Sequence, residues 1–352
     1  MTLSRYAPTS IRALSETAFD TIIDVRAPSE FAEDHVPGAI NLPVLSDNER
    51  AEVGTIYKQQ SPFMARKIGA ALVAQNAASH LQTTLADKSG GWQPLVYCWR
   101  GGQRSGSFAT ILSQVGWRVS VLEGGYKSWR RMVQDQLYNM PFPARVVLLN
   151  GGTGTGKTDI LTQARALGAQ VIDLEGLAQH RGSVFGGSGG QPSQKLFETR
   201  LAQATAALDP ARPVLIEGES NRIGAIRLPP MLWEAMRHAD IIEITAPLAA
   251  RASYIARRYA DLAQDNAQVG QILDSMRKHH SAAMVQHWQS MALDPINLSQ
   301  SLIANHYDPR YARAAQQTAP LAEITLPDLS EAALRQAAET ICTLIANTVP
   351  KS

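Results

Sequence analysis

Cys98 lies where a short apolar run, residues 95–97, passes into a tight loop, and Ser105 then begins a segment with helical periodicity. A cysteine in a glycine-containing turn before a helix is where a thiolate is stabilised, because unpaired amides and the helix dipole favour the anion. A buried, inert cysteine is the alternative, but inert cysteines sit in apolar surroundings. We therefore interpret Cys98 as a reactive thiol. Its anion-binding loop consists of Trp99, Arg100, Gly101, Gly102, Gln103, Arg104 and Ser105.

A second stretch fits the pattern G-x-x-x-x-G-K-T and stands between an apolar strand pattern, residues 145–150, and a helical pattern. Glycines let consecutive amides turn toward a phosphate, Lys157 supplies a point charge, and Thr158 can hold a magnesium ion. We therefore predict phosphate or diphosphate binding here. The residues are Gly151, Gly152, Thr153, Gly154, Thr155, Gly156, Lys157 and Thr158.

Polar residues outside these two loops are candidates for substrate or metal contacts. Glu217 and Glu219 follow an apolar strand, where an acid serves either a metal or the scaffold, and both interpretations stay open. Residues 180–198 form a long polar loop rich in glycine and serine, of the kind that often binds substrate. Its candidate residues are Arg181, Ser183, Gln191 and Lys195.

Residues 247–262 are expected to form a helix on which Arg251, Tyr254 and Arg258 share one face, with Arg257 beside them. Cations interleaved with an aromatic ring suit RNA phosphates and unstacked bases, so these residues are candidates for RNA binding. An ordinary solvated helix face is the alternative that the spacing alone allows.

The elements that must position these residues alternate between strands and helices. Strand patterns at residues 21–25, 119–122, 145–150, 170–174, 213–216 and 240–245 are separated by helical stretches, which favours an α/β fold with mainly parallel sheets and helices on both faces. Pro141 and Pro143 indicate a linker. We expect a first domain at 1–138, a linker at 139–145, a P-loop domain at 146–310, and a C-terminal strand and helix, 311–352, packing on the P-loop domain.

The composition is that of a folded protein with local charge. The 352 residues are 45% hydrophobic and carry a net charge of +2, so any basic surface must be local. Two cysteines, Cys98 and Cys342, are too few for a disulfide framework, which favours a reducing cytoplasm. We find no signal peptide pattern and no apolar run long enough for a membrane span.

The stretch 24–43 (DVRAPSEFAEDHVPGAINLP), the cysteine loop and the stretch 122–129 (LEGGYKSW) together resemble a rhodanese domain. With the P-loop and the stretches HRGSVFG, QPSQKLFE and EGESNRIG, the whole architecture resembles the tRNA 2-selenouridine synthase family. The resemblance adds Asn221 and Arg222, in the last of these stretches, to the substrate candidates.

This resemblance implies a transferase that acts on 2-thiouridine at the wobble position of the tRNA anticodon loop. It would S-geranylate the base with geranyl diphosphate and replace sulfur by selenium from selenophosphate, with Cys98 as the selenium carrier. These two donors are co-substrates, Mg²⁺ is a candidate ion, and no tightly bound organic cofactor is implied. A selenophosphate-supplying enzyme is a candidate partner.

Several alternatives stay open at this point. The P-loop could bind geranyl diphosphate, selenophosphate or a nucleoside triphosphate. The chain could instead be an ATP-dependent kinase or sulfur-activating enzyme with a rhodanese sulfur donor, or a nucleotide-binding sulfide sensor. The tRNA base could reach both centres by motion about the prolines of the linker or across a shared cleft.

Overall fold

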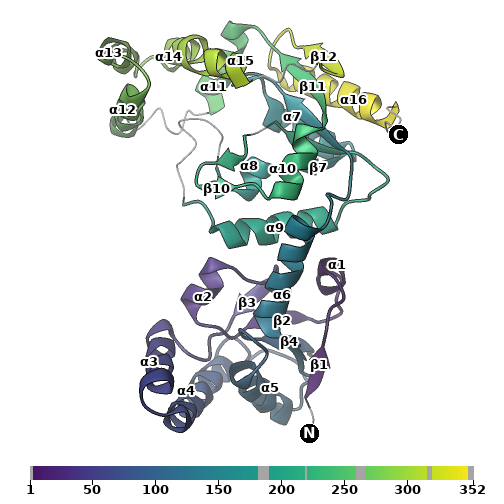
Figure 1. Ribbon diagram of the computed structural model, residues 1–352, viewed down its shortest axis with the longest axis vertical. Coiled ribbons are helices and arrows are strands. Elements are labelled where there is room, and N and C mark those ends of the chain that lie inside the picture. Colours follow the sequence, from purple (N-terminus) through teal and green to yellow (C-terminus); the bar gives the residue numbers. More distant parts are fainter. Residues whose placement is uncertain (1–2, 181–189, 219, 259–265, 315–318, 348–352) are drawn as a thin grey trace. The chain divides into compact units, whose positions relative to one another are not determined.

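The computed structural model describes residues 3–180, 190–218, 220–258, 266–314 and 319–347 (Figure 1). The chain divides into two compact units, and each unit is built from two separate segments of the chain. The first unit comprises residues 1–141 and 192–207, and the second comprises residues 142–191 and 208–352. Each unit is an α/β structure with its own parallel five-stranded sheet, which confirms the expected fold class.

The sheet of the first unit is parallel throughout, and its central strand β4 is buried at every residue. This is the pattern of a strand covered by helices on both faces. All its carboxyl ends lie at one edge, where Cys98 follows β4 directly. The strands, in the order in which they lie side by side, are β1 (Ser4–Tyr6), β5 (Ser120–Leu122), β4 (Pro94–Tyr97), β2 (Thr21–Asp24) and β3 (Ala39–Asn41).

Residues 50–75 belong to two helices of the first unit, α3 and α4. The break falls at Ser61, whose side chain caps the second helix, and at Pro62, which occupies its first position. The helices of the first unit are α1 (Ile11–Ser15), α2 (Pro28–Glu33), α3 (Asp47–Gln59), α4 (Pro62–Gln82), α5 (Gln103–Val115), α6 (Gly125–Gln134), the π-helix η1 (Asp135–Asn139) and α9 (Gln194–Ala206).

Helix α9 belongs to the first unit although the chain around it belongs to the second, and it contacts α1, α6 and η1. The indole of Trp129, fully buried, donates to the Thr199 hydroxyl at 3.3 Å. Glu198 is ion-paired with Arg130 and accepts from the Tyr138 hydroxyl at 2.7 Å. The sequence division assigned residues 194–206 to the P-loop domain. The structure instead places them in the first unit, because α6 offers α9 an apolar partner, Trp129, and a charged partner, Arg130, and η1 packs beside them.

The sheet of the second unit is also parallel throughout, with the P-loop strand at its centre. The strands, in the order in which they lie side by side, are β12 (Ala322–Thr325), β11 (Asp240–Thr245), β6 (Val146–Asn150), β8 (Val214–Glu217) and β7 (Gln170–Ile172). The edge strand β12 and the last helix, α16, come from the C-terminal stretch, and α16 packs against α7.

A separate group of helices lies between β11 and β12 in the chain, and α12, α13 and α14 build a small core of their own around Trp288. The helices of the second unit are α7 (Lys157–Ala166), α8 (Leu174–Leu177), α10 (Pro230–Arg237), α11 (Leu248–Arg258), α12 (Asn266–Ser275), α13 (Ala282–Ser290), α14 (Pro295–Leu302), α15 (Asp308–Ala314) and α16 (Glu331–Asn347). Shorter elements are the helical turns η3 (Met276–Lys278) and η4 (Ile303–Tyr307) and the hairpin strands β9 (Arg222–Ile223) and β10 (Ile226–Arg227).

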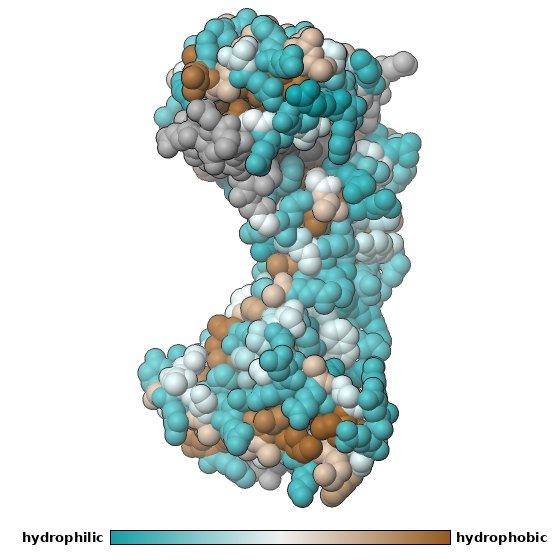
Figure 2. All heavy atoms as spheres, turned by 90° about the vertical axis from the view of Figure 1, so that its left-hand side faces the viewer, coloured by the Kyte–Doolittle hydropathy of each residue, from teal (hydrophilic) through white to brown (hydrophobic). Residues whose placement is uncertain are grey.

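Hydrophilic residues cover most of the face shown in Figure 2, with apolar side chains in patches between them. Among the helices that the structure describes, none combines the length and the hydropathy that a bilayer span requires.

Trp129→Ala should loosen α9, because it removes a fully buried side chain and its bond to Thr199. We expect the unfolding free energy of the first unit to fall by about 3–5 kcal/mol. Hydrogen–deuterium exchange should show faster amide exchange at residues 194–206. Ile341→Ala, in the core of the second unit, is the matched control and should leave exchange there unchanged. Equal effects of the two variants would contradict the assignment of α9 to the first unit.

Candidate functional site

The Cys98 loop is held by the backbone of α6. The amide of Tyr126 donates to the carbonyl of Cys98 at 2.8 Å, and the amide of Lys127 donates to the carbonyl of Trp99 at 3.0 Å. In a trans peptide the carbonyl and the amide point in opposite directions, and the described chain contains no cis peptide. The amides of Trp99 and Arg100 therefore point away from α6, and that of Arg100 donates to the Cys98 sulfur.

Two glycines make this close approach feasible. Gly101 and Gly125 both have positive φ, +65° and +59°. A Cβ at Gly125 would lie 2.5 Å from the Gly101 nitrogen and closer still to the Cys98 carbonyl oxygen. The glycine pair of the stretch 122–129 and the start of α6 therefore fix the shape of the cysteine loop.

The environment of Cys98 lowers the pKa of its thiol. Burial, which leaves the residue 4% exposed, would raise the pKa, but hydrogen bonds to sulfur outweigh it. The Ser105 hydroxyl donates to Sγ at 3.2 Å, and the amides of Ser105 and Arg100 also donate. The charge of Arg104 contributes least, because Arg104 is ion-paired with Glu30 at 2.7 Å.

The Ser105 hydroxyl thus lowers the pKa of the Cys98 thiol more than the charge of Arg104 does. Arg100 is exposed, as is Trp99 at 37%, whose ring lies 5.3 Å from that of Tyr126. The sequence placed Ser105 in the anion-binding loop without assigning a role to its hydroxyl. Its hydroxyl could have been found from its place in the first turn of α5, which faces the preceding strand end.

Behind the loop lies a buried charged network that keeps α6 in place. Asp24 and Arg26 form a doubly hydrogen-bonded ion pair, 0% and 1% exposed. The Arg26 guanidinium also lies 3.9 Å from the centre of the Tyr126 ring, and the Tyr126 hydroxyl donates to Asp34 at 2.7 Å. Burial raises the pKa of Asp34, opposed by the Tyr126 hydroxyl. These residues are scaffold, since their polar atoms are occupied by one another.

In the second unit, three consecutive carbonyls of the P-loop are each held by a donor. Lys157 Nζ donates to the Gly151 carbonyl at 2.7 Å, and Thr155 donates to that of Gly152 at 2.9 Å through its hydroxyl. Arg251 Nε donates to the Thr153 carbonyl at 2.9 Å. By the same peptide geometry, the amides of residues 152–154 point away from these donors. Consecutive amides turned to one side form an anion-binding concavity.

Glu217 lies beside the P-loop lysine and threonine because its strand neighbours the P-loop strand. The register pairs Leu149 with Glu217, and Glu217 oxygens lie 3.5 Å from Lys157 Nζ and 3.2 Å from Thr158 Oγ1. A hydroxyl and a carboxylate are oxygen donors of the kind that Mg²⁺ prefers. Among the residues that the structure describes, no group of three or more histidine, cysteine or acidic side chains is placed to hold a metal ion.

Arg251 does not lie on an exposed RNA-binding face, as the helical spacing led us to expect. It is 8% exposed and forms two bonds with Asp308, at 3.0 and 2.6 Å, besides its bond to the P-loop. Tyr254 and Arg258 share its face but contact Asp159 at 2.7 and 3.2 Å. The face is turned toward the P-loop and α7, because α11 follows β11, the strand beside β6. Arg257 is exposed.

Asp308, the partner of Arg251, had no signal in the sequence, because it stands 57 residues after Arg251. The same holds for Tyr311, whose hydroxyl donates to Glu243 at 2.7 Å and which stands 68 residues after that acid. Asp159 follows the P-loop threonine directly and could have been included with the motif.

The remaining candidates have other partners or are exposed. Gln191 bonds the carbonyl of Ile223 and the amide of Ala225, so it supports the β9–β10 hairpin. Lys195, on α9 of the first unit, is ion-paired with Glu33 at 2.6 Å. The exposed pair Asn221 and Arg222 lies at the start of the hairpin. Arg181, Ser183 and Glu219 lie outside the described residues.

Two family descriptions match the chain. Residues 7–132 match the rhodanese-like domain, and residues 144–288 match the tRNA 2-selenouridine synthase AAA domain. These matches confirm the expected order of a rhodanese-like domain followed by a P-loop domain.

Curated relatives named tRNA 2-selenouridine synthase align with most of the chain. The protein of Hahella chejuensis is 34% identical over 337 residues, which is 85% of this chain and 86% of that protein. The protein of Shewanella frigidimarina is 33% identical over 82% of this chain and 87% of its own length. The protein of Nitrosomonas europaea is 38% identical over 68% of this chain, and the alignment spans 63% of that relative.

Ser105→Ala should raise the pKa of the Cys98 thiol by about one unit, because the hydroxyl donor to sulfur is lost. Less thiolate is then present at neutral pH, so alkylation by iodoacetamide slows there while the alkaline plateau is unchanged. The measurement uses a Cys342→Ser background, in which only Cys98 reacts. Ser107→Ala on the same helix is the control. An unshifted pH profile would rule out this role of the hydroxyl.

Arg251→Met should weaken binding of inorganic diphosphate about tenfold, because the Thr153 carbonyl loses its donor and the Gly154 amide loses its orientation. Isothermal titration calorimetry measures the effect. Arg313→Met, at an exposed residue of α15, is the matched control and should bind as the unmodified chain does. Equal affinity of all three proteins would show that the loop keeps its shape without Arg251.

Proposed function

Because the chain belongs to the tRNA 2-selenouridine synthase family of enzymes, we propose that it converts 2-thiouridine at the wobble position of tRNA into 2-selenouridine in two stages. The first is S-geranylation with geranyl diphosphate, and the second is replacement of sulfur by selenium from selenophosphate. The observation that carries this proposal is the presence of two anion-stabilising loops in one chain, one built around a thiol and one around a lysine. A cytoplasmic location, where tRNA is modified, is part of the proposal.

The P-loop is assigned the alkylation stage. The sulfur of the base attacks the first carbon of the geranyl chain, the carbon–oxygen bond breaks, and diphosphate leaves with the electron pair. The base then loses its N3 proton. Lys157 and the amides of residues 152–154 offset the charge that accumulates on the departing diphosphate. The Thr158 and Glu217 oxygens would hold Mg²⁺, which supplies further positive charge to a diphosphate when bound.

Cys98 is assigned the selenium stage. S-alkylation turns the thiocarbonyl sulfur into a competent leaving group, so selenium can displace geranyl thiol at C2 of the base. Cys98 carries the selenium as a perselenide. Selenophosphate supplies selenium at the selenide level, so joining it to the Cys98 sulfur passes two electrons to a disulfide and releases phosphate. Once the selenium is bonded to C2, a thiol cleaves the sulfur–selenium bond and returns the two electrons. The hydrogen bonds that lower the pKa of its thiol also stabilise a bound selenium anion, because they act on negative charge at the same place.

The tRNA contacts in this proposal rest on an exposed cation. Arg257 is exposed at the end of α11 and suits phosphates of the anticodon loop, whereas Arg258 is ion-paired with Asp159. A selenophosphate-supplying enzyme is the partner that the second stage requires.

A second candidate is an ATP-dependent enzyme that activates sulfur from a rhodanese donor. The contact of Glu217 with the P-loop lysine and threonine favours it, since nucleotide-hydrolysing P-loop proteins use an acid at this place for Mg²⁺. Magnesium-dependent ATP turnover that saturates with ATP would favour this candidate over geranyl transfer from geranyl diphosphate.

Incubation of the purified chain with 2-thiouridine tRNA and geranyl diphosphate should yield a heavier, more hydrophobic nucleoside. Mass spectrometry of nucleoside digests measures it, and selenophosphate added afterwards, together with a thiol and its disulfide, should give 2-selenouridine. Omission of each donor in turn is the control. No mass shift with geranyl diphosphate would overturn the first stage of the proposal.

Two variants should separate the two stages. Cys98→Ser should leave geranylation largely intact and stop selenium incorporation, because it removes the carrier but leaves the P-loop unchanged. Lys157→Ala should lower the rate of geranylation about 100-fold or more, since a charge that acts on the leaving group is lost. Selenouridine formation at the unmodified rate by the serine variant would contradict the carrier role.

A further inference from the structure

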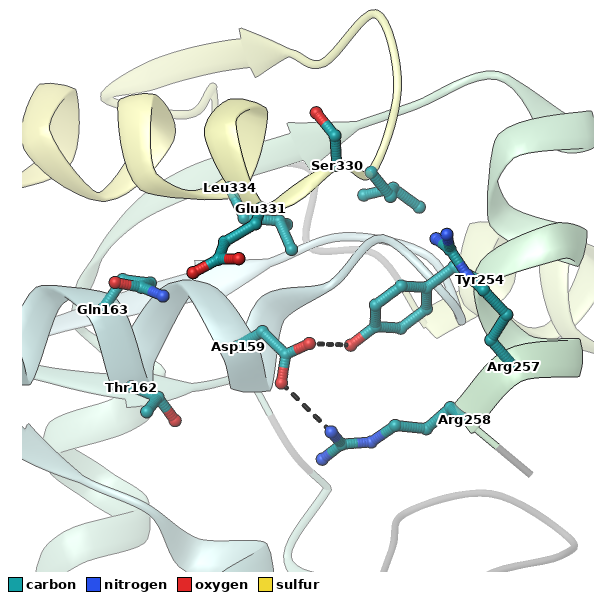
Figure 3. A pocket seen from close by; sticks show the side chains of 10 residues that line it. Asp159, Thr162, Gln163, Tyr254, Arg257, Arg258, Ser330, Glu331 and Leu334 are labelled. Carbon is teal, nitrogen blue, oxygen red and sulfur yellow. Dashed lines mark hydrogen bonds and ion pairs between the residues drawn. The ribbon is translucent and has the colours of Figure 1, made fainter. Parts of the chain in front are cut away.

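A cavity of about 410 Å³ lies beside the P-loop, between α7, α11 and the start of α16 (Figure 3). Gln163 lines it from α7, Tyr254 and Arg257 line it from α11, and Leu329 and Leu334 line it from the C-terminal stretch. The cavity lies by the carboxyl edge of the sheet, since α7, α11 and α16 follow β6, β11 and β12. Ligands of open α/β sheets bind in crevices at this edge.

The walls of the cavity are continuous with the P-loop. A Cβ built on Gly156, the last glycine of the loop, would lie 2.6 Å from Leu334 Cδ2 and 3.3 Å from Leu329 Cδ2. A Cβ on Gly154 would lie 2.8 Å from Ile255 Cδ1, beside Tyr254 on the same helix. A group attached to a phosphate in the loop therefore needs only a short reach to enter the cavity.

Three polar side chains of the cavity are bonded to one another. The Tyr254 hydroxyl donates to Asp159 at 2.7 Å, Arg258 donates to the same carboxylate at 3.2 Å, and Figure 3 shows both bonds. The hydroxyl of Ser330 accepts from the Ala333 amide at the start of α16. Leu329 and Leu334, 5% and 6% exposed, provide an apolar wall. Gln163, Arg257 and Glu331 also line the cavity, so the case for a hydrocarbon rests on the apolar wall and the Tyr254 ring.

We propose that this cavity holds the geranyl chain of geranyl diphosphate while the P-loop amides hold its diphosphate. This inference rests on the proposed function and adds to it the site that selects the organic group. The volume is sufficient, because a cavity of about 150 Å³ already accommodates benzene, and the geranyl chain has ten carbons. Of the charged residues that line the cavity, Asp159 and Arg258 are ion-paired, and Arg257 and Glu331 carry opposite charges.

The test places a large side chain in the cavity from α7. Gln163 is half-buried and lines the cavity, whereas Ala166, on the same helix, is exposed and does not. Gln163→Trp should raise the dissociation constant for geranyl diphosphate about tenfold or more and leave that for inorganic diphosphate within about twofold. Unchanged diphosphate affinity also shows that the variant is folded. Ala166→Trp, the matched control, should change neither value.

The outcomes separate this inference from the proposed function. Geranylation at the unmodified rate and affinity in Gln163→Trp would overturn the cavity assignment and leave the proposed function standing. Absence of geranyl diphosphate binding and of geranylation in the unmodified chain would overturn both. A loss of ADP affinity in Gln163→Trp, with geranyl diphosphate affinity unchanged, would show that the cavity holds a nucleoside and would also overturn the assignment.

Discussion

A trans peptide group cannot turn its carbonyl one way without turning its amide the other way, and both anion-binding loops depend on this constraint. In the first unit, amides of α6 hold the carbonyls of Cys98 and Trp99, so that the amides that follow are free to face sulfur. In the second unit, Lys157, Thr155 and Arg251 hold three consecutive carbonyls of the P-loop. The two loops share no sequence pattern, yet each presents amides because its carbonyls are already bonded elsewhere.

The donors that hold these carbonyls are themselves fixed by charged partners, half-buried in the case of Asp308 and buried in the case of Asp24 and Arg26. Arg251 is fixed by Asp308, and α6 is fixed through Tyr126 by Asp34 and by the ion pair of Asp24 and Arg26. Removing one member of a buried ion pair is costly because the other charge is left uncompensated. The loops are therefore preorganised for an anion, which is what electrostatic stabilisation of developing charge requires.

Because α9 belongs to the first unit but lies between two segments of the second, the two units are joined by three chain crossings rather than by a single linker. The chain passes between the units at residues 141/142, 191/192 and 207/208. The segment that returns to the first unit packs against Trp129 and Arg130, which belong to α6, the helix that holds the Cys98 loop. Helix α9 therefore packs against α6, and α6 holds the loop of Cys98, the selenium carrier that we propose.

The sequence by itself determined both loops, the alternation of strands and helices, and the family, because these depend on local spacing: a cysteine or a G-x-x-x-x-G-K-T motif between a strand and a helix. Only the tertiary structure decided which partners complete the loops. The bonds of Arg251 to Asp308, the place of α9 in the first unit and the cavity beside Gly156 join residues that lie far apart in the chain. The helical period predicted that Arg251, Tyr254 and Arg258 share a face, and it could not tell whether that face meets solvent or the P-loop. That choice depends on which strand lies next to β6, and strand order is fixed by packing of the whole sheet rather than by any local pattern.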